Sequence, residues 1–314
     1  MKFNNRYGLP GPLVTALQAD SYDLKNPPEN VISLTTLIGP PKAKILEMRH
    51  SEEIEIDVSE CFWRVLGTAC HTVMEDATKG LDMAEMRWFM DVATHTLYVT
   101  SGRPEQESWY NPKTIYVSGK IDIYQPDEKK LSDYKITSVW SWLLEKQMKP
   151  EHEAQLQVNG LAMKAIGHEV EKLSVVMMFR DWSRTKNGED LPVPFKEIFT
   201  DFWKPEDTLA YIDQRVKLHY EARKLADDEI PECNPEERWA RPTIYAVMKP
   251  CRKSSVKNFD LRPTPAQMAD FPGCTIQERP GIDAKCESYC VSKNWCLYYK
   301  NVYGVKTVPV EETY

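Results

Sequence analysis

Two short strands in the middle of the chain constrain its fold most strongly. Residues 115–123 alternate between apolar and polar side chains, and the polar, proline-containing segment 125–129 favours a hairpin connection to a second strand. Asp122 lies on the polar face of the first strand. On the second strand, Asp133 and Lys135 share a face because they are two residues apart. The sequence therefore predicts two carboxylates and an ammonium group on adjacent strands.

This group of side chains suits the hydrolysis of phosphodiesters. Two carboxylates on neighbouring strands can hold a divalent cation through their oxygens. A lysine beside them can orient a water molecule or offset the charge of a phosphate. The alternative is a solvated ion pair on an exposed strand, which the same Asp-x-Lys spacing allows, so the flanking segments decide between the two.

A helix that carries a histidine is predicted upstream. Asp57 and Glu60 have the spacing of a capping box, and apolar residues then recur at helical intervals as far as Val73. His71 and Glu75 are four residues apart, so they share one face of this helix, turned away from most of the apolar stripe. His71 is therefore a candidate metal ligand, and the alternative is an ordinary surface histidine.

Downstream segments alternate between helical and strand patterns. Residues 151–166 and 205–225 predict helices, and residues 173–179 and 194–203 predict strands, the first of which is almost entirely apolar. An alternation of this kind predicts an α/β fold.

Taken together, these motifs resemble the RecB-like branch of the PD-(D/E)XK nuclease superfamily. The matching segments are residues 66–71 for its Gly-x-x-x-His helix, 119–122 for its Gly-x-x-Asp strand, 133–135 for its Asp-x-Lys strand and 155–159 for its Gln-x-x-x-Tyr helix. Asn159 stands where the family usually has tyrosine. Residues 33–41 also look like the N-terminal segment of phage-encoded members, and the resemblance as a whole covers a core of about residues 32 to 230.

The resemblance implies a restriction-endonuclease-like core, in which a central mixed sheet is flanked by helices. It also implies a catalytic site for one or two Mg²⁺ or Mn²⁺ ions, whose ligands are His71, Asp122, Asp133 and the backbone carbonyl of Tyr134. In such a site Lys135 helps to activate the attacking water, and Gln155 positions Lys135 or the phosphate. Glu75 contacts a water on the metal.

The cysteines give a second signal. The chain has eight, and six of them lie at or beyond position 233. Cys286, Cys290 and Cys296 are close enough in sequence to converge on one metal centre, which needs a fourth ligand from elsewhere. Thiolates of this kind suit an iron–sulfur cluster or a structural zinc ion, and spacing does not separate the two. Disulfides are disfavoured, because residues 1–6 lead into no apolar core of a signal peptide, and clustered cysteines in a cytosolic chain more often bind metal.

Several RecB-like nucleases resemble this arrangement, with a distant cysteine and a C-terminal trio around a 4Fe–4S cluster. The segment around Cys233 looks like the version in which the first ligand follows the core, so Cys233 is the expected fourth ligand. Cys61 is the nearest counterpart of the other version, and Cys251 and Cys274 are further alternatives.

The net charge of −7 is unusual for a protein that binds nucleic acid. It argues against tight coating of DNA, although a local basic groove can still bind a threaded strand. The cations nearest in sequence to the predicted site are Lys120, Lys129, Lys130, Lys135, Lys146 and Lys149. For these lysines an ordinary solvated surface is the alternative. Arg252 and Lys253, with Lys257, offer a second possible phosphate contact beside the cysteines.

The sequence predicts three segments. Residues 1–56 form an N-terminal extension, residues 57–230 the nuclease core, and residues 231–314 a cysteine-rich lobe packed on that core. The chain has no apolar run of about 18 residues, so no membrane span is expected. A cytoplasmic location follows, which is the host cytoplasm if the protein is phage-encoded.

The predicted function is a metal-dependent DNA nuclease. An exonuclease that acts on DNA ends or single strands, in recombination, replication or repair, fits the motifs best, and a helicase or recombinase is a possible partner. The alternatives are a structure-specific endonuclease, which would use the same residues, and a cysteine-rich DNA-binding module without catalysis. The three charged residues of the two strands argue against the last, because a module without turnover has no chemical need for them.

Overall fold

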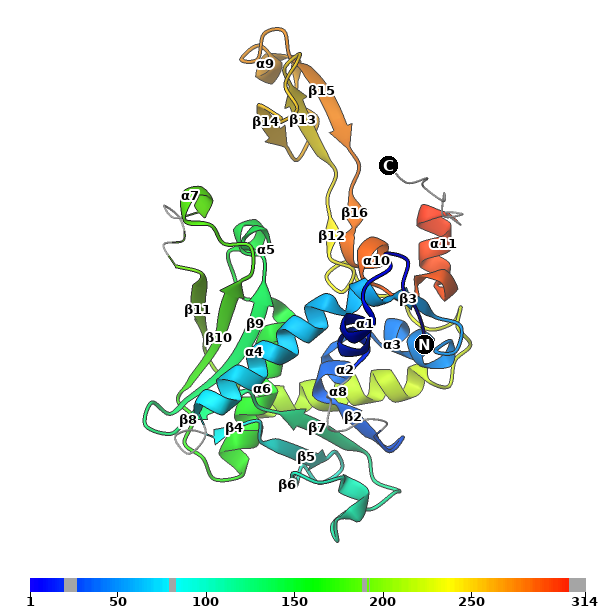
Figure 1. The fold of residues 1–314 in the computed structure, drawn as a ribbon, viewed down its shortest axis with the longest axis vertical. Coiled ribbons are helices and arrows are strands. Elements are labelled where there is room, and N and C mark those ends of the chain that lie inside the picture. Colours follow the sequence, from blue (N-terminus) through cyan, green and yellow to red (C-terminus); the bar gives the residue numbers. More distant parts are fainter. Residues whose placement is uncertain (20–26, 79–82, 188–190, 192, 305–314) are drawn as a thin grey trace. The chain divides into compact units, whose positions relative to one another are not determined.

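Strands and helices alternate along the chain in a mixed α/β fold (Figure 1). The computed structural model describes residues 1–19, 27–78, 83–187, 191 and 193–304. Two units are distinguished: the first comprises Met1–Pro41 and Glu55–Lys224, and the second comprises Lys42–Ile54 and Leu225–Tyr314. The residues that the sequence grouped as an N-terminal extension are thus shared between both units.

A five-stranded mixed sheet forms the centre of the first unit. Its strand order is β11-β10-β9-β8-β4, and only β9 and β10 are parallel neighbours. The strands are β4 (Met83–Ala84), β8 (Ile123–Gln125), β9 (Lys130–Thr137), β10 (Lys172–Phe179) and β11 (Phe195–Thr200). The strands predicted at 173–179 and 194–203 correspond to β10 and β11, and the hairpin predicted around 125–129 joins β8 to β9.

A second sheet of the same unit has the order β2-β7-β5-β6. Its strands are β2 (Val31–Ser33), β5 (Arg87–Asp91), β6 (Leu97–Val99) and β7 (Tyr116–Lys120). Since β7 belongs to this sheet and β8 to the five-stranded one, the prediction of one continuous strand over residues 115–123 is wrong. The ladder between β8 and β9 stops at Ile123 and Ser132, and Asp122 lies at the junction of the two sheets.

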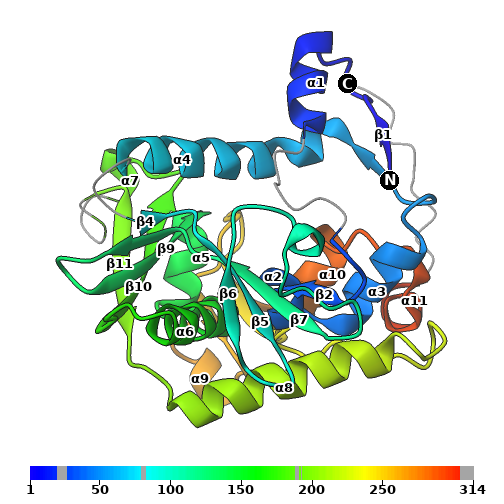
Figure 2. The ribbon, with the colours of Figure 1, turned by 90° about the horizontal axis from the view of Figure 1, so that it is seen from below.

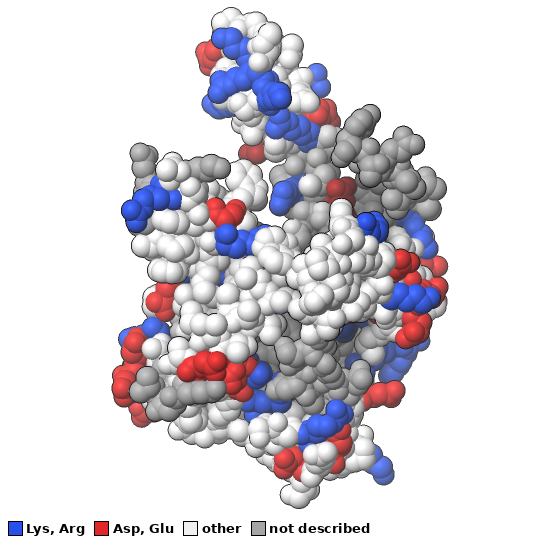
Figure 3. Space-filling view, viewed as in Figure 1, with Lys and Arg blue, Asp and Glu red and all other residues white. Residues whose placement is uncertain are grey.

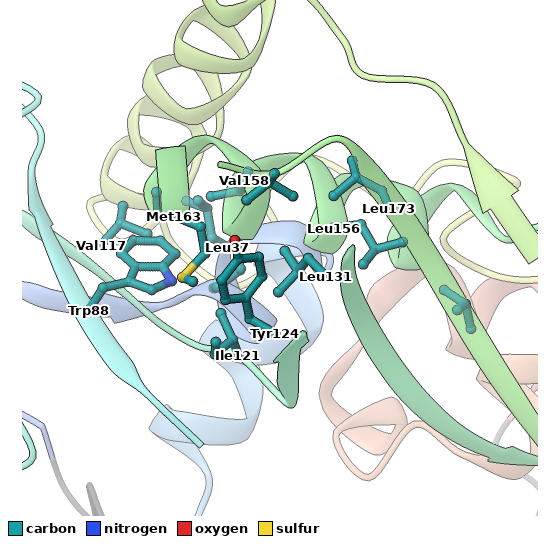
Figure 4. Packing of buried hydrophobic residues seen from close by; sticks show 14 of the residues in the cluster. Leu37, Trp88, Val117, Ile121, Tyr124, Leu131, Leu156, Val158, Met163 and Leu173 are labelled. Carbon is teal, nitrogen blue, oxygen red and sulfur yellow. The ribbon is translucent and has the colours of Figure 1, made fainter. Parts of the chain in front are cut away.

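The glycine of the Gly-x-x-Asp motif is required by packing. A Cβ atom at Gly119 would lie 2.1 Å from a ring carbon of Trp88, which is completely buried. The indole Nε1 of Trp88 donates a 3.0 Å hydrogen bond to Oδ1 of Asn159, a buried residue of α6 (Pro150–Ala165). Figure 4 shows Trp88 beside Val117 and Met163 in the apolar core. The asparagine at the family's tyrosine position therefore has a structural partner in this chain.

Two long helices lie on opposite faces of the five-stranded sheet, α4 (Phe62–Thr78) on one and α6 on the other (Figure 2). The predicted capping box of Asp57 and Glu60 is present, but it opens the 3₁₀ helix η1 (Val58–Cys61), which α4 follows. α4 has no buried residue, and Val73 on its apolar stripe is 66% exposed. The apolar stripe is thus only partly covered: Val65 packs against the cluster around Val58, whereas Val73 is open to solvent.

The remaining elements of the first unit are β1 (Lys2–Asn4), α1 (Gly11–Gln18), α2 (Leu34–Ile38), β3 (Glu55–Asp57), η2 (Pro104–Gln106), α5 (Val139–Glu145), α7 (Arg184–Asn187) and α8 (Pro205–Ala222). The predicted helix at 205–225 corresponds to α8, which begins at a proline and has two acidic residues in its first turn, as its dipole favours. No helix in the described part of the chain is long and apolar enough to cross a membrane.

The second unit contains short helices and a separate antiparallel sheet. The helices are α3 (Pro41–Arg49), α9 (Pro265–Met268), α10 (Ala284–Ser288), η3 (Lys293–Trp295) and α11 (Leu297–Tyr303). The strands are β12 (Ala240–Arg241), β13 (Ile244–Met248), β14 (Lys257–Phe259), β15 (Thr275–Arg279) and β16 (Ile282–Asp283). β12 pairs with β16, and the other three form a sheet in the order β14-β13-β15.

Candidate functional site

Asp122 is held at the junction of the two sheets by the neighbouring strand. Its Oδ2 accepts a 2.7 Å hydrogen bond from the backbone N–H of Tyr134 in β9. This bond leaves Oδ1 directed to the other side, where it lies 3.6 Å from Nδ1 of His71. The break between β7 and β8 thus allows the carboxylate to face helix α4.

His71 is flanked by a second carboxylate. Nδ1 of His71 lies 3.9 Å from Oε1 of Glu85, which follows β4 with a left-handed backbone (φ 56°). Ligand atoms of His71, Glu85 and Asp122 all lie within 4.8 Å of one another, and these three are the only such group among the described residues. Glu85 also forms an ion pair with Lys120.

Asp133 and Lys135 form the next part of the site. They share a face of β9, as predicted, and Nζ of Lys135 lies 2.6 Å from Oδ2 of Asp133. Asp133 is 2% exposed; its Oδ2 is paired with Lys135, whereas its Oδ1 has no hydrogen-bond partner among the described residues. Buried carboxylates of that kind are uncommon, because an unpartnered polar group in the interior is costly.

Two residues of α6 lie on the lysine side. Oε1 of Gln155 accepts a 3.2 Å hydrogen bond from Nζ of Lys135, as the Gln-x-x-x-Tyr resemblance implies. His152, one turn earlier on the helix, has a buried Nδ1 without a hydrogen-bond partner among the described residues. Burial, together with the positive charges of Lys135 and Lys149, lowers the pKa of His152 to about 3, so its imidazole is neutral.

The structure brings together most, but not all, of the residues that the sequence singled out. His71, Asp122, Asp133, Lys135 and Gln155 are linked through the contacts above, and the Tyr134 ring lies edge-on to His71 at 6.4 Å between centroids. Glu75, one turn beyond His71 on α4, is not in the group of close ligand atoms. The glutamate of that group is Glu85 instead. Its distance in sequence from His71 matches no helical or strand repeat, so the sequence pattern did not predict it.

The charges of the site perturb one another strongly. Burial, reinforced by the Asp133 carboxylate, raises the pKa of Asp122 to about 8. Burial alone would lower the pKa of Lys135, but the carboxylates of Asp133 and Asp122 outweigh it and raise the value. Burial lowers the pKa of His71 and so favours the neutral imidazole that can bind a metal. A bound cation would reduce the electrostatic repulsion among these partly buried carboxylates.

The donor set fits a divalent cation. The group of close ligand atoms combines carboxylate oxygens of Glu85 and Asp122 with one imidazole nitrogen, ligands that suit Mg²⁺ or Mn²⁺. Asp133, expected from the sequence as a ligand, is not in that group, but its charge acts on Asp122. The buried Oδ1 of Asp133 supplies the independent observation, because it has no hydrogen-bond partner among the described residues. These residues can therefore hold a metal beside the ammonium group of Lys135.

The second unit has a pocket lined by four cysteines. They are Cys233, Cys286, Cys290 and Cys296, the same four that the sequence nominated. All four are free thiols, and burial raises the pKa of Cys233 to about 12, with the other three thiols adding to the shift. The thiol at Cys286 behaves similarly, with a pKa of about 11. A metal centre here would have to displace protons from these sulfurs on binding.

The spacing of the thiols bears on the kind of centre. A zinc ion with four Zn–S bonds of about 2.3 Å holds its sulfurs about 3.8 Å apart. No three of these thiols lie within 4.8 Å of one another, because the described residues contain only one such group of ligand atoms, which is in the first unit. As placed in the structure, the four sulfurs are therefore not gathered as they would be around one zinc ion.

Positive side chains surround the cysteine pocket. Lys42, Arg238 and Lys293 line it together with the cysteines. Lys42 is 2% exposed, and its Nζ donates a 2.7 Å hydrogen bond to the carbonyl of Ile230. A buried lysine is rare unless negative charge offsets its own, which thiolate ligands would supply.

Comparisons with known proteins add little. No family model and no curated protein matches the chain. One solved structure that aligns with it is described as "Crystal structure of SSO0001", with a TM-score of 0.42 and 14% sequence identity, over 72% of this chain and 87% of that one. A similarity this low supports no conclusion about fold or function.

Proposed function

We propose that the first unit is a metal-dependent DNA nuclease with a restriction-endonuclease-like core. The observation that carries the proposal is the buried carboxylate of Asp133 in the same site as Asp122: its Oδ2 lies 2.6 Å from Nζ of Lys135, and its Oδ1 has no hydrogen-bond partner among the described residues. Phosphodiester hydrolysis needs a cation site and a positive group next to the reacting phosphate, and these side chains can supply both.

Each residue has a role in this proposal. Glu85, Asp122, Asp133 and His71 would hold the cation, which when bound lowers the pKa of a water molecule and offsets charge on the phosphate. Lys135 stays protonated because of the flanking carboxylates, so it donates hydrogen bonds to a phosphate oxygen or to the attacking water. Gln155 anchors the flexible lysine chain through its 3.2 Å hydrogen bond and so keeps the ammonium group aimed at the site.

An exonuclease is the preferred form of this activity. The test compares a linear single strand, a linear duplex and a covalently closed single-stranded circle, each with Mg²⁺ or Mn²⁺. We expect the linear substrates to be degraded from their ends and the circle to survive. Cleavage of the circle at the same rate would favour the structure-specific endonuclease instead. No degradation of any DNA with either cation would contradict the nuclease proposal.

For the second unit we propose a 4Fe–4S cluster on Cys233, Cys286, Cys290 and Cys296. The convergence of the four thiols on one pocket and the positive residues that line it support a metal centre with negative charge, as a thiolate-bound iron–sulfur cluster has. The cluster would have a structural role in this cysteine-rich lobe, because hydrolysis transfers no electrons. It would join Cys233 to the C-terminal trio and restrict the long segment between them in the unfolded chain.

Metal analysis of anaerobically purified protein tests the cluster. We expect about four iron and four sulfide per chain and absorbance near about 400 nm, as is usual for cysteine-ligated iron. Cys290→Ser should abolish that absorbance and lower the melting temperature, whereas the exposed Cys251→Ser should change neither. One zinc per chain would support the structural-zinc alternative, and four freely titrating thiols in metal-free protein would contradict both.

The setting of this activity is also a proposal. A nuclease of this kind would act on DNA in the cytoplasm, that of the host if a phage encodes it, during recombination, replication or repair. A helicase or recombinase would be the natural partner to supply its substrate.

A further inference from the structure

An arm of the second unit, residues 240–283, carries an unusual concentration of positive charge. β12 and β16 pair at its base, and the sheet β14-β13-β15 with α9 forms its outer part (Figure 1). All residues of the arm are described. Two cysteines of the pocket bracket it, Cys233 before β12 and Cys286 after β16.

The positive charge is densest in the connection between β13 and β14. Between positions 249 and 259 there are four basic residues and no acidic one, although the whole chain has a net charge of −7. The four are exposed and are Lys249, Arg252, Lys253 and Lys257. None of them forms an ion pair with a carboxylate of the described residues. Lys and Arg atoms run along the arm on the face shown in Figure 3.

The basic connection is ordered by backbone hydrogen bonds. The N–H of Arg252 donates to the carbonyl of Lys249 at 3.2 Å, and the N–H of Val256 donates to that of Val247 at 2.8 Å. Cys251 between them has a left-handed backbone with φ of 64°. The cations therefore lie on a turn that is already folded, so less conformational entropy is lost when they bind a partner.

The base of the arm is fixed beside the cysteines. Asp283 in β16 accepts a 3.2 Å hydrogen bond from Nε of Arg238 and a 2.6 Å bond from the hydroxyl of Tyr298. Arg238 also donates to the backbone carbonyl of Cys233. Asp283 is 6% exposed, so this network links the stem of the arm to the cysteine-bearing segments through buried contacts.

The side chains of the arm fit a phosphate backbone better than unpaired bases. Proteins that bind single strands offer exposed aromatic rings for stacking. The arm offers none, because Phe259 packs edge-on to Phe271 at 6.2 Å and Lys257 lies 5.1 Å over the Phe259 ring. Cations on a β-ribbon are suited to the regularly spaced phosphates of a duplex.

We propose that this arm binds the backbone of double-stranded DNA through the cations of its β13–β14 turn. The inference rests on the proposed function insofar as DNA is the substrate. It adds a second contact with the DNA, separate from the site at which a strand is degraded. Binding through the arm needs no catalysis, so it can be measured when the catalytic site is disabled.

The test is a fluorescence-anisotropy titration of a short labelled duplex, carried out at several salt concentrations in Asp133→Asn protein. The arm variant combines Lys249→Gln, Arg252→Gln and Lys253→Gln. The control variant removes the same charge from exposed lysines of the α8 region, with Lys204→Gln, Lys217→Gln and Lys224→Gln. Circular dichroism and the metal content of the second unit check that both variants fold.

We expect the arm variant to bind the duplex at least tenfold more weakly. The slope of log K against log salt should fall by about 2 to 3 in magnitude, because each phosphate that a protein neutralises contributes about 0.9 to that slope. The control variant should retain the parental slope. Equal weakening in both variants, unchanged binding by the arm variant, or weakening confined to single-stranded DNA would overturn the proposal. Nuclease assays of the arm variant with Asp133 restored, on short single strands, report separately on the catalytic site.

Discussion

The side chain of Asp122 is tied to the backbone of Tyr134, whose N–H lies 2.7 Å from Oδ2. This bond crosses from the junction between β7 and β8 to the middle of β9. It fixes one carboxylate oxygen and leaves the other facing His71 at 3.6 Å. Asp122 thus has a structural task and a chemical one, and the two can be separated by substitution.

Asp122→Asn should keep the fold and lose activity, because the amide oxygen can still accept from Tyr134 but is a poor metal ligand. Asp122→Ala leaves the Tyr134 N–H without its acceptor and should lower the free energy of unfolding by about 1–3 kcal/mol. Urea denaturation and a nuclease assay on both variants measure the difference. If both variants were equally stable, the hydrogen bond would have no structural weight, and an active Asp122→Asn protein would remove Asp122 from the metal site.

The second prediction concerns which glutamate assists the metal. Glu85→Gln and His71→Ala should each raise the Mn²⁺ concentration needed for half-maximal activity by about tenfold or more, since each removes a ligand atom from the group within 4.8 Å. Glu75→Gln is the matched control, because Glu75 lies one turn along α4 from His71. A metal requirement that changes in Glu75→Gln and not in Glu85→Gln would restore the assignment made from sequence.

The third prediction tests the packing behind the motif glycine. Gly119→Ala would push a methyl group into the indole of Trp88, which is completely buried and fixed by Asn159. Overpacking of this kind typically costs about 1–3 kcal/mol, and more where the neighbour cannot move. Thermal unfolding of Gly119→Ala gives the value. Wild-type stability would show that the Trp88 ring is free to shift.

The fourth prediction is a dependence of stability on pH. His219 in α8 is 1% exposed, and burial, assisted by Arg215, lowers its pKa to about 4. Between pH 4 and the ordinary value of 6.5 the unfolded chain binds a proton that the folded chain does not, so stability falls as the pH falls through this range. The slope from this one group is at most about 1.4 kcal/mol per pH unit.

Urea midpoints at about pH 7 and about pH 5 measure this effect. His219→Gln, whose amide can still donate to the carbonyl of Leu37 as the ring does at 3.2 Å, should lose less stability between the two pH values than the wild type. Identical losses in the two proteins would mean that His219 does not contribute to acid sensitivity.

The sequence predicted correctly those helices and strands whose formation depends on nearby residues. The helices α6 and α8 and the strands β9, β10 and β11 occur where apolar periodicity, prolines and acidic first turns indicated them. The common face of Asp133 and Lys135 follows from the two-residue repeat of a strand alone. The convergence of four cysteines on one pocket was expected from their spacing together with the family resemblance.

The features that the sequence did not reveal depend on distant parts of the chain. The predicted strand is interrupted at Asp122. There the N–H of Tyr134 in β9 donates to the Asp122 side chain, and the ladder between β8 and β9 ends at Ile123 and Ser132. Glu85 reaches His71 through a left-handed turn, which has no periodic signature. The apolar stripe of α4 satisfies helical periodicity, yet periodicity does not say whether a neighbour covers it, and Val73 remains exposed.

The most direct test of the central claim is the Mg²⁺- or Mn²⁺-dependent degradation of linear DNA by wild-type and Asp133→Asn protein. Circular dichroism on the same samples controls for folding. We predict that the variant keeps the wild-type spectrum and that its rate falls at least about 100-fold, since removing a charge that acts on the transition state costs about 3 kcal/mol or more. A folded Asp133→Asn protein that degrades DNA at the wild-type rate, or wild-type degradation that persists without divalent metal, would contradict it.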